Sequence, residues 1–97
     1  MSSPAEQSLP VSFSTLILSL ASSAVLALGL EKNPHTGQIE KDLDVARFNI
    51  DMLNMLKTKT KGNLDKDEQH FLDSVVGDLQ MKFVYVSQGQ GGGSKTT

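Results

Sequence analysis

The feature that most constrains this chain is residues 13–30, a run of 18 residues without a charged side chain. Such a run reaches the lower limit for a membrane-spanning helix. Against a membrane span, no Lys or Arg precedes the run and no Trp or Tyr marks a membrane interface. The missing cationic segment also disfavours a signal peptide. Hydroxyl side chains further dilute the run, at Ser14, Thr15, Ser19, Ser22 and Ser23.

The run predicts a helix over about residues 14–28, with Ser12 or Ser14 as its N-cap. At 100° per residue, seven apolar side chains share one face. They are Phe13, Leu16, Ile17, Leu20, Ala24, Ala27 and Leu28. The opposite side has no charges, only small or apolar residues: Thr15, Leu18, Ser19, Ser22, Ser23 and Leu26. A helix of this kind is expected to be covered on both sides.

A second helix is expected over about residues 40–58, after a turn at residues 33–37 (Asn-Pro-His-Thr-Gly). Its polar stripe is narrow and consists of Asp44, Arg47, Asp51 and Asn54. Apolar residues fill both flanks, with Leu43, Ala46, Ile50 and Leu53 on one and Val45, Phe48, Met52, Met55 and Leu56 on the other. Asn49 interrupts this arc, either fixing the register of an interface or lying partly exposed.

Lysines at residues 57–61 and the following Gly62 are typical of a helix end. Asp65 and Glu68 then form a capping box that predicts the start of a third helix. This helix has one ordinary apolar face, made of Phe71, Leu72, Val75, Val76, Leu79 and Phe83. Residues 83–86 (Phe-Val-Tyr-Val) are aromatic or β-branched, so they predict a short extended segment at its end.

The three helices are expected to form one domain over residues 12–87, between a flexible leader (1–11) and a disordered Gly/Ser tail (88–97). A core this small is marginally stable, and oligomerisation is a common remedy. About six apolar side chains exceed what a three-helix unit covers, and leaving them in water would forfeit roughly 10 kcal/mol. The sequence therefore predicts an all-α, three-helix unit that assembles as a homo-oligomeric bundle. The predicted interface consists of Thr15, Ser19, Ser22, Leu26, Val45, Phe48, Met52 and Met55.

Four segments carry a resemblance to a known family: FSTLILSLASSAVLALGL, NPHTG, DLDVARFNIDMLNMLKTKTKGNLDKDEQHFLD and DLQMKFVYV. In this order and spacing the chain resembles the bacterial domain of unknown function 1844 family over about residues 12–86. The most specific part is IDMLNMLKTKTKGN, residues 50–63. The resemblance implies a small cytoplasmic bacterial protein, and it implies no activity.

The composition disfavours several classes of function. Without cysteine there is no disulfide, thiolate zinc site or cysteine nucleophile, which fits a reducing cytoplasm. The two histidines, His35 and His70, show no converging ligands, so we expect no metal and no cofactor. No phosphate loop, nucleophile elbow or dinucleotide fingerprint occurs, and we expect no enzymatic activity and no catalytic residue.

Lys57, Lys59 and Lys61 form the one basic cluster, in a chain whose net charge of −2 is unusual for a nucleic-acid binder. These lysines would suit phosphate groups, yet helix C-capping explains them more simply because no stacking aromatic is nearby in the sequence. We therefore expect a non-enzymatic, cytoplasmic homo-oligomer that contacts itself and an unidentified protein. The alternatives are an RNA- or ribosome-associated accessory protein using residues 57–61 and a membrane-associated protein using the first helix.

Overall fold

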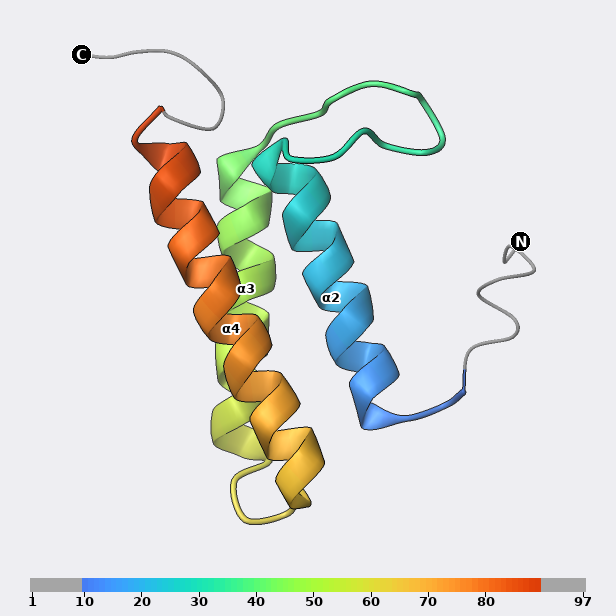
Figure 1. Cartoon of the computed structure of the whole chain (residues 1–97), viewed down its shortest axis with the longest axis vertical. Coiled ribbons are helices and arrows are strands. Elements are labelled where there is room, and N and C mark those ends of the chain that lie inside the picture. The colour runs from blue at the N-terminus through green and yellow to red at the C-terminus, as the bar shows by residue number, and fades with distance from the viewer. Residues whose placement is uncertain (1–9, 90–97) are drawn as a thin grey trace.

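Three helices lie side by side in an up–down–up arrangement (Figure 1). The computed structural model describes residues 10–89, and its helices are α2 (Phe13–Leu28), α3 (Leu43–Lys59) and α4 (Lys66–Ser87). Each helix contacts the other two. No strand occurs in residues 10–89, so the predicted all-α unit is confirmed there. The predicted leader and tail lie almost entirely outside these residues.

Each of the three helices begins at a side-chain cap. Ser12 Oγ accepts the backbone N–H of Thr15 at 3.1 Å, which selects one of the two N-caps that the sequence allowed. Asp65 and Glu68 form the predicted capping box of α4. Asp42 caps α3, so this helix begins at Leu43, three residues after the predicted start at residue 40. The capping carboxylate decides this difference because it satisfies N–H groups that the first turn leaves unpaired.

The connection between α2 and α3 contains the predicted turn. Gly37 has a φ of 72°, the left-handed conformation that glycine adopts without strain. The Glu40 carboxylate holds the connection together, since it accepts Asn33 Nδ2 and Thr36 Oγ1, each at 2.9 Å. Backbone bonds add to these contacts, since the Gly37 N–H donates to the Asn33 carbonyl at 2.7 Å.

The core lies along the line where the three helices meet, and every helix contributes to it. Its buried apolar side chains are Ile17, Ala24, Ala27, Leu28, Ala46, Ile50, Leu53, Leu72, Val76, Leu79 and Val86. Most of the predicted inward positions are confirmed. Leu16 is an exception, because 43% of this residue is exposed at the edge of α2.

The predicted extended segment at residues 83–86 is wrong, because α4 continues as a helix to Ser87. An extended chain would turn Val84 and Val86 to the same side. In the helix, Val86 is buried at 1% exposure, whereas Val84 is 51% exposed. Burial of Val86 in the core overrides the local β-propensity of this segment.

Candidate functional site

An apolar stripe runs along the outer side of α3. Val45, Phe48, Met52 and Met55 recur at spacings of three and four residues, so they lie on one side of the helix. Val45, Phe48 and Met55 are 45%, 62% and 41% exposed, and Met52 is half-buried. The chain's own packing therefore leaves this predicted interface stripe largely uncovered.

The neighbouring surface of α2 continues this stripe. Its Ser19 and Ser22 are exposed, and Thr15 and Leu26 are half-buried. Leu26 and Val45 line the same shallow hollow between the two helices, which run side by side in opposite directions (Figure 1). The structure thus brings Leu26 and Val45 into one hollow, and it leaves the other predicted residues exposed or half-buried on α2 and α3. We call the eight predicted residues the α2/α3 face: Thr15, Ser19, Ser22, Leu26, Val45, Phe48, Met52 and Met55.

A second apolar surface lies on the outer side of α4, and the sequence analysis missed it. Met81, Val84 and Tyr85 are 74%, 51% and 52% exposed, and they line one hollow with Gly77, Gln80 and Gln88. We call these six residues the α4 face. Their spacing from residue 77 is typical of one helical side. That signal was available in the sequence, but predicting residues 83–86 as extended concealed it.

Asn49 is buried in the single chain, whereas the sequence allowed it either a place at an interface or partial exposure. It is 7% exposed, and its Nδ2 donates to the Val45 carbonyl at 3.0 Å. The amide thus bonds to its own helix one turn earlier, a local bond that needs no second copy.

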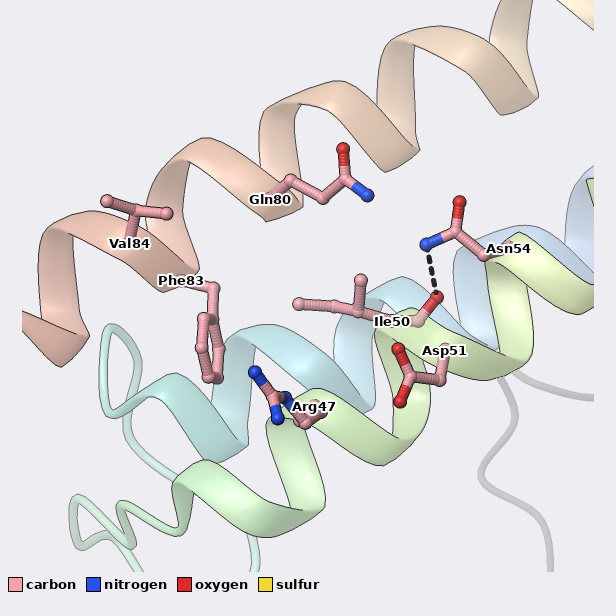
Figure 2. A pocket seen from close by; sticks show the side chains of 7 residues that line it. All are labelled: Arg47, Ile50, Asp51, Asn54, Gln80, Phe83 and Val84. Atoms are coloured by element: carbon pink, nitrogen blue, oxygen red, sulfur yellow. Dashed lines mark hydrogen bonds between the residues drawn. The ribbon is translucent and has the colours of Figure 1, made fainter.

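Figure 2 shows a further hollow between α3 and α4, where the Arg47 guanidinium lies 5.5 Å from the centre of the Phe83 ring. Asp51, Asn54 and Gln80 also line it. Its volume is about 180 Å³, below the roughly 300–1,000 Å³ of ordinary ligand sites. The contact between Arg47 and Phe83 is a cation–π interaction that joins the two helices.

The three lysines of the predicted phosphate patch are exposed where α3 ends and the turn to α4 begins. Lys57 is engaged, because its Nζ lies 3.1 Å from Asp73 Oδ1 on α4. This hydrogen bond holds the pKa of the Asp73 carboxyl below its ordinary value. A lowered carboxyl pKa means that the stabilisation is present at neutral pH and is lost as the pH falls through that pKa. One of the three lysines therefore already has an acidic partner.

Within residues 10–89, no group of three metal-ligating side chains is arranged to hold an ion. His35 and His70 are both exposed. None of the helices in this part of the chain is sufficiently long and apolar to cross a membrane.

A family model described as "Domain of unknown function (DUF1844)" matches residues 10–85. The chain belongs to this family. No curated protein and no solved structure matches it. The match covers all of α2 and α3 and nearly all of α4, so it includes the whole α2/α3 face and all of the α4 face except Gln88.

Two kinds of surface feature remain in this DUF1844 domain, namely exposed carboxylates and exposed apolar side chains. A general acid or base usually needs an enclosed, perturbed environment, whereas the carboxylates of Asp44, Asp51 and Glu40 lie on exposed residues. The two apolar faces hold several of the exposed large apolar side chains. Exposed apolar surface of this kind marks interaction sites.

Proposed function

We propose that this DUF1844 protein is a non-enzymatic interaction protein that works as a homo-oligomer, with copies meeting through the α2/α3 face. The observation that carries the proposal is that Phe48 is 62% exposed within the apolar stripe of α3. A large aromatic side chain gains most from being covered, and aromatics are enriched at the centres of interfaces.

The pattern of side chains along α3 supports a second copy as the occupant. Suppose two α3 helices run antiparallel about a two-fold axis between Asp51 and Met52. Phe48 of each copy then lies level with Met55 of the other, and Asp44 lies level with Lys59. On each side of the axis, the Phe48 ring meets the Met55 thioether and the Asp44 carboxylate meets the Lys59 ammonium group. The surface is therefore complementary to itself.

The charges at the ends of α3 have a second role that is independent of assembly. Asp44 in the first turn and Lys57 and Lys59 in the last turn complement the helix macrodipole. The apolar side chains between them have no such explanation. We therefore rest the proposal on Phe48 and its neighbours and use the charges only to orient the two copies.

The small side chains of α2 complete the face. Ser19 and Ser22 are small and exposed on α2, so they leave a low surface that side chains of a second copy could approach closely. A stable interface buries about 800 Å² per partner, and the whole chain exposes 6617 Å². The α2/α3 face extends along two helices, each about 24 Å long.

The test is the mass of Phe48→Glu in detergent-free solution, measured by light scattering over a concentration series. Introducing a carboxylate at this position on both copies is expected to raise the dissociation constant at the α2/α3 face by more than about 100-fold. Because Phe48 is exposed in the single chain, helix content by circular dichroism should not change.

The matched control is Gln38→Glu, which adds the same charge on the exposed connection between α2 and α3. This control should keep the wild-type mass. A second variant, Ser19→Arg with Ser22→Arg, should weaken assembly from the α2 side. If Phe48→Glu and the double arginine variant both keep the wild-type mass, the α2/α3 face is not an interface between copies.

Phosphate binding by residues 57–61 is the competing hypothesis and has weaker support, because Lys57 already pairs with Asp73. Changing Lys57, Lys59 and Lys61 to Gln should leave retention on an RNA column unchanged. Salt-sensitive retention of the wild type that disappears in this variant would instead favour the RNA-associated role, since phosphate contacts produce a steep salt dependence.

A further inference from the structure

Gly77 occupies an unusual place on the outer side of α4. It lies in the interior of a 22-residue helix, where glycine weakens the helix relative to alanine. A Cβ atom built at Gly77 meets no atom of the described residues within 4 Å, and the residue's φ is not in the positive region. Neither packing within the chain nor backbone conformation therefore requires a glycine at this position.

The residues around Gly77 point to close contact with something outside the chain. Met81 at 74% exposure and Tyr85 at 52% exposure follow it at one and two turns along the same side. All three line one hollow. A helix position without a side chain lets another element approach the backbone closely. The large apolar residues beside it are then removed from water by that element.

We infer that the α4 face packs against the α4 face of a second copy, with the two helices antiparallel. When the two-fold axis passes at the level of Met81, Tyr85 of each copy lies level with Gly77 of the other. Each aromatic ring then fills the space that the missing side chain leaves, and the two Met81 side chains meet at the centre.

The charges beside the α4 face favour this antiparallel pairing. Asp78 and Lys82 lie on one flank of α4 and form an ion pair of 2.8 Å between Lys82 Nζ and Asp78 Oδ2. A two-fold axis perpendicular to the helix pair brings the same flank of both copies together. The antiparallel pairing places Asp78 of one copy near Lys82 of the other, whereas a parallel two-fold pairing would put these flanks on opposite sides of the interface.

This second interface goes beyond the proposed function and predicts a larger assembly. The α2/α3 face lies on two helices and the α4 face on the third, so one copy can use both faces at once. Two different two-fold interfaces build a closed tetramer or an open chain of copies. The wild type should therefore exceed the mass of a dimer.

The test compares masses by sedimentation velocity for four forms: wild type, Phe48→Glu, Met81→Glu and the combined variant. We expect at least four copies for the wild type, two for each single variant and one for the combination. A wild-type dimer that Phe48→Glu dissociates and Met81→Glu does not would overturn the inference and leave the proposed function standing. A wild-type dimer that only Met81→Glu dissociates would overturn the proposed function and leave the α4 interface standing. A monomeric wild type would overturn both interfaces.

Gly77→Ala separates an interface role from a role in the helix. In the Met81→Glu background, alanine should raise the melting temperature by about 3 to 6 °C, because it is the better helix former. In the Phe48→Glu background, where only the α4 face remains, the added methyl should weaken dimerisation at least tenfold. A variant that is more stable and dimerises as tightly as before would contradict close packing at Gly77.

Discussion

Replacing Leu53 with alanine is expected to lower the free energy of unfolding by about 2 to 5 kcal/mol. Leu53 is 0% exposed in the middle of α3, and it contacts the cluster to which all three helices contribute. A domain of this size is stable by only roughly 4 to 12 kcal/mol. The substitution therefore removes a large share of the free energy of unfolding. The urea concentration at the midpoint of unfolding, measured by circular dichroism, should fall accordingly.

Met55→Ala is the matched control for this prediction. Met55 lies two residues further along α3 but is 41% exposed on the α2/α3 face. Both substitutions should be measured in the Phe48→Glu background, so that loss of assembly does not contribute. There, Met55→Ala should change the free energy of unfolding by less than about 0.5 kcal/mol. Equal losses for the two variants would mean that the two sides of α3 are wrongly assigned.

The starts of α2 and α4 could be predicted from the sequence because their causes are local. Ser12 bonds within its own first turn, and Asp65 and Glu68 bond to each other's backbone across three residues. Such contacts depend on residues that are adjacent in the sequence. The start of α3 was placed three residues too early, because Glu40 was read as the first turn of the helix. In the structure Glu40 instead binds the preceding loop.

The α2/α3 face could be predicted as a pattern, whereas its occupant could not. A helix with apolar residues on both flanks exceeds what its neighbours cover, and Phe48 does remain 62% exposed. The hydrophobic effect is non-directional, so it shows that a surface gains from being covered without identifying what covers it. Asn49 illustrates the same limit, since its position in the pattern allowed either an interface or partial exposure, whereas the structure buries it in the single chain at 7% exposure.

The end of α4 could not be predicted because two effects oppose each other there. Residues 83–86 are aromatic or β-branched and locally favour an extended chain. Packing of Phe83 against the core and burial of Val86 within it require instead that residues 83 and 86 face the same way. A spacing of three meets that requirement in a helix and not in a strand. The α4 face depends on the same result, since Val84 and Tyr85 face outward only in the helix.

Val86→Asp is the substitution that most directly tests this helical end. Val86 is 1% exposed, so a carboxylate at this position would be buried among apolar side chains. The free energy of unfolding should fall by about 3 to 5 kcal/mol at neutral pH. Part of the loss should be recovered at acidic pH, because burial raises the pKa of a carboxyl group and the neutral form is less costly to bury. Chemical unfolding at two pH values measures both effects.

Val84→Asp supplies the contrast, because it makes the same chemical change two residues earlier. Val84 is 51% exposed on the α4 face, and in the Met81→Glu background its substitution should cost less than about 1 kcal/mol. A helix separates the two positions by 200°, whereas an extended segment would place both on one side. Similar losses at residues 84 and 86 would therefore contradict the helix to Ser87. They would also remove the α4 face on which the second interface between copies depends.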